Sequence, residues 1–264
     1  MSAVTQRVGL LVIGDEILSG KRQDRHIPAV IDMLWRRGIE LAWGQILGDD
    51  EQRIAASLRR AADDGDAVLC CGGIGATPDD VTRQAAALAA GRPIALHPEG
   101  AALLREKFGE QATPQRLRMA EFPEGAELVP NPINQVAGFS IHSWFFVPGF
   151  PEMAWPMLEW VIDHRLQHLH NAEPAEEYRL RVVGTTGESD ILHIMEAILA
   201  RYAGIRLSSL PTRSNEAHAR HIELGVRGAA SLAASAYAEL LRYLHDHGGL
   251  QVEELRPPEI QPRG

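Results

Sequence analysis

Residues 72–80, Gly-Gly-Ile-Gly-Ala-Thr-Pro-Asp-Asp, combine three glycines with two carboxylates between a predicted strand, 67–71, and a predicted helix, 79–90. Glycines at the end of a strand let the backbone turn sharply and come close to a ligand. Thr77 suits the N-cap of the helix, and Asp80 completes a capping box. The amides and the positive end of the helix dipole then face one point. The segment therefore predicts a cradle for an anion.

The two carboxylates of this segment, Asp79 and Asp80, would repel a bare phosphate. A divalent cation that bridges the phosphate and the carboxylates reconciles the two features. A glycine loop alone is weak evidence, however, because a tight strand-to-helix turn with an ordinary capping box has the same composition. A purely structural turn is thus the alternative interpretation.

Two further glycine- and acid-containing turns each follow a predicted strand. Residues 14–20 follow the strand 7–13, and residues 48–51 follow the strand 39–47. In a parallel sheet these turns and the loop 72–80 lie at the same carboxyl edge, which is where open α/β sheets bind ligands. We therefore expect the three loops to meet.

Carboxylates from these loops predict a metal site. Glu16, Asp49 and Asp80 would converge at one edge, and such oxygen-rich groups are typical ligands of Mg²⁺ or Mn²⁺. Such an ion would neutralise a bound phosphate and could activate water. The alternative for Asp49 and Asp80 is helix N-capping, and for Glu16 a solvated turn charge.

Strands and helices alternate along the first part of the chain, which predicts a parallel sheet with right-handed crossovers and helices on both faces. The helices are expected near 26–37, 51–63, 79–90, 98–120 and 152–166, and further short strands near 126–129, 138–141 and 144–147. The expected fold class is α/β, a three-layer domain with a mostly parallel sheet over residues 1–168.

A second, smaller α+β domain is expected over residues 178–250, after a linker at 169–177 and before a tail at 251–264. Its pattern is β-α-β-β-α, with elements near 178–184, 188–201, 205–210, 218–227 and 229–247.

Composition excludes several classes of function. Apolar residues make up 45% and charged residues 23% of the 264 residues, as in ordinary globular proteins. A net charge of −9 argues against a general binder of nucleic acid or anionic membranes. Without a signal peptide or an apolar stretch near 18 residues, the protein is expected to be cytoplasmic. Cys70 and Cys71 are neighbours on a strand, so they suit neither a disulfide nor a metal site.

Five segments together resemble a known family. In order and spacing, GDEILSG, GDDEQRI, GGIGATPDDVTRQ, PNPINQVAGF and VPGFPEMAWPML resemble the N-terminal domain of the CinA (competence/damage-inducible protein A) family over roughly residues 7–165. That domain is similar to the molybdopterin-binding fold of molybdenum-cofactor biosynthesis proteins. Residues 178–250 resemble the KH-like middle domain of the same family. Longer members end in a nicotinamide-nucleotide deamidase domain, which we expect this chain to lack.

The resemblance implies a metal-dependent hydrolysis, with Mg²⁺, Mn²⁺ or Co²⁺, of a nucleotide pyrophosphate such as ADP-ribose or FAD. Asp80 and Asp49 align with functional aspartates of the fold, and Glu16 joins them as a catalytic and metal-binding residue. The alternative is a protein that binds molybdopterin or a related pterin phosphate without hydrolysis. A third interpretation is a scaffold protein without catalytic activity. In each ligand-binding case the expected contacts are Gly14, Gly72, Gly73, Gly75, Thr77, Asn131 and Gly149. For Asn131 and the turn at 148–151, a purely structural role as rigid turns is the alternative interpretation.

The chain departs from the family pattern at two places. Ala76 stands where the family usually has proline, and residues 21–26 form a charged rim. In this rim Lys21 and Arg25 are candidate phosphate partners, with a pair of solvated surface charges as the alternative interpretation. The resemblance and the Trp-containing segment 155–160 also predict a homo-oligomer.

Overall fold

The computed structural model describes residues 6–171, 175–184, 187–212 and 220–255. The chain divides into two compact units, Met1–Asn171 and Ala172–Gly264.

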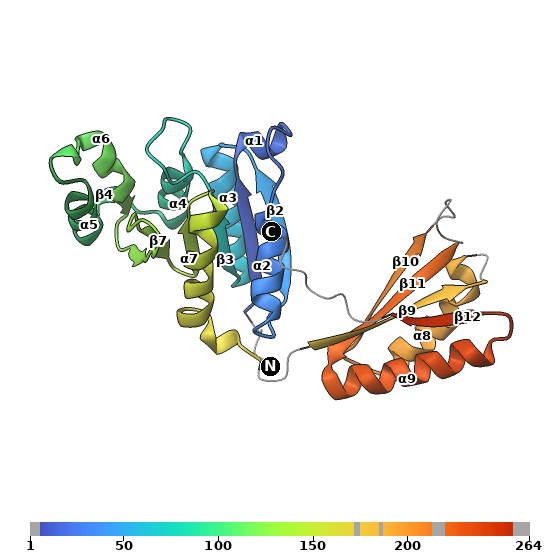
Figure 1. Ribbon diagram of the computed structural model, residues 1–264. Helices are drawn as coiled ribbons and strands as arrows, with labels where there is room; N and C mark the ends of the chain where they lie inside the picture. The colour runs from blue at the N-terminus through green and yellow to red at the C-terminus, as the bar shows by residue number, and fades with distance from the viewer. Residues whose placement is uncertain (1–5, 172–174, 185–186, 213–219, 256–264) are drawn as a thin grey trace. The chain divides into compact units, whose positions relative to one another are not determined.

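The first unit is built on a six-stranded sheet with the order β2-β1-β3-β8-β7-β6 (Figure 1). Its strands are β1 Val8–Ile13, β2 Leu41–Leu47, β3 Ala67–Cys71, β6 Glu127–Val129, β7 Gly138–Ile141 and β8 Trp144–Val147. β2, β1, β3 and β8 run parallel, and β7 and β6 are added as antiparallel strands. The expected mostly parallel sheet is confirmed.

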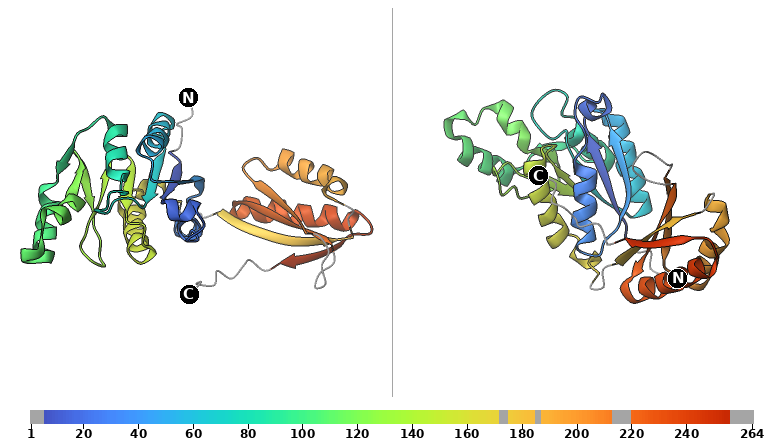
Figure 2. Two further views of the ribbon diagram at one scale, coloured as in Figure 1. Left: turned by 90° about the horizontal axis from the view of Figure 1, so that it is seen from above. Right: turned by 45° about the vertical axis from the view of Figure 1, so that its right-hand side comes forward.

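Four helices cover the two faces of this sheet, α2 His26–Trp35, α3 Glu51–Asp64, α4 Thr82–Ala90 and α7 Pro151–His164. α2 and α7 pack on one face, against Leu10 and Val12 among others, and α3 and α4 pack on the other face, against Leu11 and Ile13. Figure 2 shows these layers from two further sides. Because β1 and β3 are buried on both faces, they need a continuous run of apolar residues. Cys70 and Cys71 accordingly lie buried in opposite layers.

A small appendage lies between α4 and β6. Strands β4 Ile94–Leu96 and β5 Glu121–Pro123 pair antiparallel, and they frame α5 Pro98–Phe108 and α6 Pro114–Leu117. The helices were expected within 98–120, whereas the two three-residue strands are too short to leave a pattern in the sequence.

The second unit has a four-stranded antiparallel sheet with the order β10-β11-β9-β12. The elements are β9 Ala175–Val183, α8 Leu192–Arg201, β10 Arg206–Thr212, β11 His221–Ala229, α9 Ala230–Asp246 and β12 Gln251–Leu255. Alternate residues of β9 and β11, such as Leu180 and Leu224, pack against α8 and α9.

Two predicted boundaries need correction. β12 pairs with β9 within the stretch 251–264 for which we expected a tail, because a polar edge strand has no clear alternation. Residues 256–264 lie outside the described residues. β9 already starts at Ala175, inside the expected linker, whose residues 172–174 are also outside the description.

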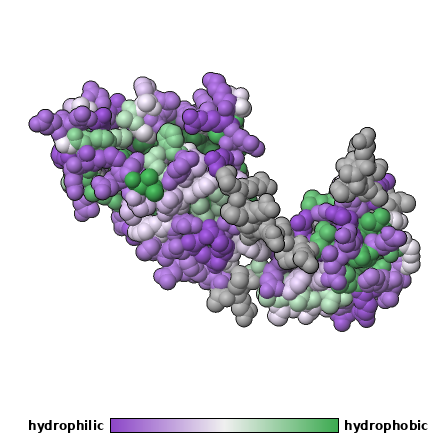
Figure 3. Space-filling view, viewed as in Figure 1, coloured by the Kyte–Doolittle hydropathy of each residue, from purple (hydrophilic) through white to green (hydrophobic). Residues whose placement is uncertain are grey.

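The surface is mainly polar on the face seen in Figure 3, with smaller apolar areas between the charged side chains. In the described ranges no helix has both the length and the apolar character that a membrane span requires. Trp155 and Trp160 of α7 pack partly against the core, so the homo-oligomer stays a prediction.

Candidate functional site

A cavity of about 580 Å³ lies at the carboxyl ends of β1, β3 and β8. We call it the loop pocket. The three loops expected to meet do so here, together with the turn that follows β8. Of the predicted site residues it is lined by Gly14, Glu16, Asp49, Gly72, Gly73, Gly75, Thr77, Asp80 and Gly149.

Asn131 does not line the pocket, contrary to expectation. Its side chain is buried, accepts a hydrogen bond from the Ile133 amide at 3.0 Å and donates one to the Val136 carbonyl at 3.1 Å. These bonds fix the turn that presents Asn134 and Val136 to the cavity. Asn131 therefore shapes the wall without touching the space inside.

The glycine loop is held in a conformation that only glycine adopts easily. Gly72 and Gly73 have φ of 109° and 68°. A Cβ atom on Gly72 would lie 2.2 Å from the Ile13 carbonyl oxygen, and one on Gly73 would lie 2.2 Å from Oγ1 of Thr82. The loop is thus packed tightly against Ile13 and Thr82.

The backbone amides of this loop are unused hydrogen-bond donors. Among the described residues, no group accepts a hydrogen bond from the backbone amides of Gly73, Ile74, Gly75 or Ala76. Consecutive backbone amides at a turn form a concave site for an anion. This observation supports the cradle that the sequence predicts.

The predicted capping box is wrong. α4 begins at Thr82, and its N-cap position, Val81, makes no side-chain cap. The Asp80 carboxylate instead accepts hydrogen bonds from the Thr77 amide at 2.8 Å and the Thr77 hydroxyl at 2.5 Å, while the Asp80 amide donates to the Thr77 carbonyl at 3.1 Å. With Pro78 at its second position this is a β-turn that closes before the helix starts.

Asp49 is not a helix cap either. Asp50 caps α3 by accepting hydrogen bonds from the amides of Gln52 and Arg53, both at 3.0 Å. Asp49 accepts a hydrogen bond from the Asp15 amide at 3.0 Å, and the Asp49 amide donates to the Asp15 carboxylate at 3.3 Å. The two aspartates therefore tie the first loop to the second.

The carboxylates of the pocket influence one another. Glu16 lies in a short helix, α1 Asp15–Leu18, and not in the open turn that we expected. Burial raises the pKa of Asp49, the hydrogen bond from the Asp15 amide opposes this rise, and the charges of Asp15, Glu16 and Asp79 add to it. The cavity therefore has a strongly negative wall.

The metal-binding residues predicted from the sequence share this wall without forming a ready metal site. Glu16, Asp49 and Asp80 all line the loop pocket. In the part of the chain that the structure describes, no three His, Cys, Asp or Glu side chains are grouped closely enough to hold an ion. Further oxygen ligands would have to come from a bound molecule.

The cation at this pocket is Arg22, whereas we had expected Lys21 and Arg25. The Arg25 guanidinium lies over the Trp155 ring at 5.4 Å from its centroid. Three cations within five residues carry no spacing that tells which one faces the cavity, so the sequence offered no signal for this choice.

An apolar wall, also missed from the sequence, lies within the same pocket. It consists of Met119, Val136, Phe150 and Met153, of which Phe150 is 52% exposed. Aromatic and Met side chains in a pocket that also has a polar cradle are typical contacts for a flat ring.

His26 holds the turn that carries Phe150. Its ring is buried, and Nε2 lies 3.2 Å from the Gly149 carbonyl oxygen. Burial lowers the pKa of His26, so the neutral ring donates this bond at pH 7. The Asp24 carboxylate accepts hydrogen bonds from the His26 and Ile27 amides and anchors the start of α2.

The match to a known protein family covers most of the first unit. The family described as "Probable molybdopterin binding domain" matches residues 9–168. A CinA-like protein of Anaeromyxobacter dehalogenans is 32% identical over 210 residues, which are 76% of this chain and 51% of that protein. A CinA-like protein of Citrifermentans bemidjiense is 38% identical over 161 residues, 58% of this chain and 39% of its own. The chain thus spans about half or less of these relatives' length.

A solved structure agrees with these matches. The crystal structure of "the protein CinA with unknown function" from Thermoplasma acidophilum has a TM-score of 0.55 and 26% identity, and the match covers 60% of this chain and 98% of that one. The resemblance to CinA-like proteins is therefore confirmed. By the match over residues 9–168, the chain belongs to the family of the probable molybdopterin binding domain.

Proposed function

We propose that the loop pocket binds a small molecule in which a heterocyclic ring carries a phosphate or pyrophosphate, a pterin phosphate or a nucleotide. The observation that carries this proposal is the row of four backbone amides, from Gly73 to Ala76, that find no acceptor among the described residues, in a pocket that also has apolar lining residues. The cavity of about 580 Å³ falls within the roughly 300–1,000 Å³ of small-molecule sites. The family's description supports the same ligand class.

The phosphate end of the ligand binds at the glycine loop. Because Gly72, Gly73 and Gly75 have no side chains, phosphate oxygens can approach the amides directly. Arg22 adds a charge-assisted hydrogen bond from the pocket rim. The ring lies against Phe150 and Met153, which removes apolar surface from water.

A divalent cation accompanies the phosphate in this proposal. Glu16, Asp49 and Asp80 offer only oxygen atoms, which suits Mg²⁺, Mn²⁺ or Co²⁺. Mg²⁺ in particular is commonly held by one or two carboxylates together with substrate phosphates and water, so it needs no group of three protein ligands. The raised pKa of Asp49 reflects a negative field that a bound cation would relieve.

Hydrolysis of a pyrophosphate, as in ADP-ribose or FAD, is the second candidate, and the carboxylates favour it. A bound divalent cation would neutralise the pyrophosphate and lower the pKa of water. Asp49, whose pKa is raised, is the carboxylate best suited to accept a proton from that water. Arg22 and the glycine loop would hold the phosphates while the bond breaks.

The test compares binding with turnover on one preparation of the full chain. Calorimetric titration with ADP-ribose and with a pterin phosphate, with Mg²⁺ and with a chelator, is expected to show saturable binding that Mg²⁺ strengthens. AMP release from ADP-ribose and FAD with Mg²⁺, Mn²⁺ or Co²⁺ then decides between binding alone and hydrolysis. If none of these ligands binds, the proposal is wrong.

Arg22→Gln and Glu124→Gln provide a matched pair. Arg22 lines the pocket, whereas Glu124 is an exposed residue between β5 and β6 that does not. We expect Arg22→Gln to weaken binding about tenfold and Glu124→Gln to leave it unchanged.

A further inference from the structure

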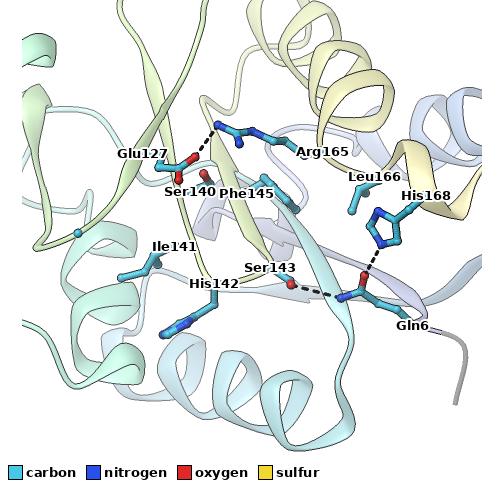
Figure 4. A pocket seen from close by; sticks show the side chains of 11 residues that line it. Gln6, Glu127, Ser140, Ile141, His142, Ser143, Phe145, Arg165, Leu166 and His168 are labelled. Carbon is cyan, nitrogen blue, oxygen red and sulfur yellow. Dashed lines mark hydrogen bonds and ion pairs between the residues drawn. The ribbon is translucent and has the colours of Figure 1, made fainter. Parts of the chain in front are cut away.

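A second cavity, of about 230 Å³, lies at the opposite edge of the same sheet (Figure 4). In its wall, Gln6 lies two residues before β1 and Ser143 directly before β8, whereas the loop pocket follows these strands. The two cavities share no lining residue. We call this one the Ser140 pocket.

Its floor is a row of cross-strand neighbours. Ser140 of β7 pairs with Glu127 of β6 on one side and with Phe145 of β8 on the other. All three line the pocket, and the end of α7 closes it with Arg165 and Leu166. The floor is thus part of the rigid sheet.

Ser140 offers a free hydroxyl to this cavity. The residue is 6% exposed, and its hydroxyl makes no hydrogen bond with any of the described residues. The hydroxyl oxygen is not among the fully buried polar atoms that lack a partner in the described ranges, so it is open to the cavity that it lines. A bound molecule can therefore accept its O–H.

Hydrogen bonds around the cavity fix further donors. The Gln6 carboxamide accepts a bond from Nε2 of His168 at 3.0 Å and donates one to the Ser143 hydroxyl oxygen at 3.2 Å. This leaves the Ser143 O–H available as a donor. Figure 4 shows this chain of three side chains on one side of the pocket.

The cation of the site is Arg165. One of its nitrogens, Nη2, lies 2.6 Å from the Glu127 carboxylate. The guanidinium has five N–H groups, so this pair leaves donors for a second acceptor. The Glu127 side chain is 64% exposed and can move into solvent if an anion competes for Arg165.

From these groups we infer that the Ser140 pocket binds a small oxyanion, a phosphate or a carboxylate, through Arg165, Ser140 and Ser143. Guanidinium and hydroxyl groups donate to the oxygens of both kinds of anion. A cavity of about 230 Å³ accepts only a small molecule or the anionic end of a larger one. Glu127 acts as the internal competitor that the anion displaces from Arg165.

The test is an NMR titration of the full chain with inorganic phosphate and, separately, with acetate, with sodium chloride as the ionic-strength control. The Arg165 side chain and the indole N–H of Trp160 report on the site, because the guanidinium lies 5.6 Å from that ring's centroid. Saturation by phosphate alone identifies a phosphate site, and saturation by acetate identifies a carboxylate site. Saturation by neither overturns the inference.

Variants with opposite expected effects separate this site from others. Arg165→Gln and Ser140→Ala should each weaken binding, Arg165→Gln by about tenfold, whereas Glu127→Gln should strengthen it several-fold by removing the competitor. Arg36→Gln is the control, because Arg36 forms a similar surface pair with Glu159 at 3.0 Å. Weaker binding by Glu127→Gln, or unchanged binding by Arg165→Gln, contradicts the inference.

The loop pocket is tested in the same series with Arg22→Gln. If that variant alone loses phosphate binding, the anion occupies the loop pocket, and the inference fails while the proposed function stands. If Arg165→Gln alone loses it, the Ser140 pocket is the site, whatever the ligand of the loop pocket.

Discussion

The two sheets of this chain use their charged side chains in different ways. In the first unit, four carboxylates line the loop pocket from segments beyond the strand ends, and within the described residues no ion pair joins them to a basic side chain. In the second unit, charged residues lie in mid-strand across the open sheet face. There Glu223 pairs with Arg179 at 2.7 Å and with Arg181 at 3.3 Å.

Under the proposed function, this difference separates charges that stabilise the fold from charges that contact a ligand. Arg181 also reaches Glu253 of β12 at 3.1 Å, so three neighbouring strands are joined by one network. Like charges gathered without direct ion pairs are costly, and natural proteins keep them mainly where function requires them. The comparison predicts that substitutions in the loop pocket change ligand binding or turnover, and that substitutions in the network change stability.

The largest effect is expected for Asp80→Asn. If the chain hydrolyses ADP-ribose, loss of this carboxylate should lower turnover by about two orders of magnitude or more, because charge on the pyrophosphate is left uncompensated. The asparagine oxygen can still accept the bonds from Thr77, so stability should fall by less than about 1 kcal/mol.

AMP release and thermal melting on the same preparation check this prediction, with Glu16→Gln as a companion. A variant that melts earlier but hydrolyses as fast as the parent would reduce Asp80 to a structural turn residue. If the parent hydrolyses nothing with any metal, the same variants are compared by ligand affinity.

The second effect in size is expected for Gly73→Ala. Gly73 has a φ of 68°, and a Cβ atom there would lie 2.2 Å from Oγ1 of Thr82. The loop must shift, so ligand affinity should fall about tenfold and stability by about 1–3 kcal/mol. Gly91→Ala is the matched control, because Gly91 has a φ of 63° with nothing within 4 Å of its Cβ position.

Calorimetry and melting of both glycine variants separate the backbone cost of a positive φ from the cost of displacing Thr82. The control carries only the backbone cost of a positive φ, so the difference between the variants measures the packing beneath the loop. Equal losses in both would mean that Thr82 moves aside freely and that the loop is not tightly held.

The third prediction concerns the second unit. Glu223→Gln removes the shared partner of two arginines that are each 26% exposed, and should lower stability by about 1–3 kcal/mol. Glu253→Gln, at a side chain 63% exposed, should cost less than about 1 kcal/mol. Chemical denaturation checks both. Neither substitution should alter ligand affinity at the loop pocket. An altered affinity would contradict the distinction between the two sheets.

Sequence patterns were sufficient for the parts of the fold that rest on burial. β1 and β3 are continuous apolar runs between helix-period segments, and this alone indicates a parallel sheet with covered faces. From that topology it follows that the loops after β1, β2 and β3 share an edge. The pattern failed at the polar edge strand β12, where burial is slight, and at β4 and β5, which are only three residues long.

The candidate site was harder to predict because side-chain hydrogen bonds determine the role of each residue in it. Thr77 and Asp80 have the spacing of a capping box, yet they close a turn before the helix begins. Asp49 and Asp50 are adjacent and chemically identical, and only the loop geometry makes one a cap and the other a tie to Asp15. Which of several neighbouring cations faces the pocket, here Arg22, depends on that geometry too.

The smallest effect on stability is expected for Asp49→Asn, and its sign depends on the ion. Burial and nearby carboxylates raise the folded-state pKa of Asp49 above the ordinary value of 3.8, so the ionised form is less favourable in the folded than in the unfolded chain. Above the raised pKa the parent therefore carries an electrostatic cost. That cost falls as the pH drops through the raised pKa and vanishes below about 3.8.

Asparagine removes this cost and can still accept the bond from the Asp15 amide. At pH 7 without divalent ions, the melting temperature of Asp49→Asn should therefore exceed the parent's by about 1 °C, and the two should coincide near pH 3.8. With saturating Mg²⁺ and ligand the order should reverse, because the parent gains the binding energy of the ion and the variant does not. Differential scanning calorimetry in chelator and in Mg²⁺ checks both signs. A variant that is less stable than the parent in chelator would show that Asp49 serves mainly to tie the two loops, and the negative wall would then lose its role as a cation site.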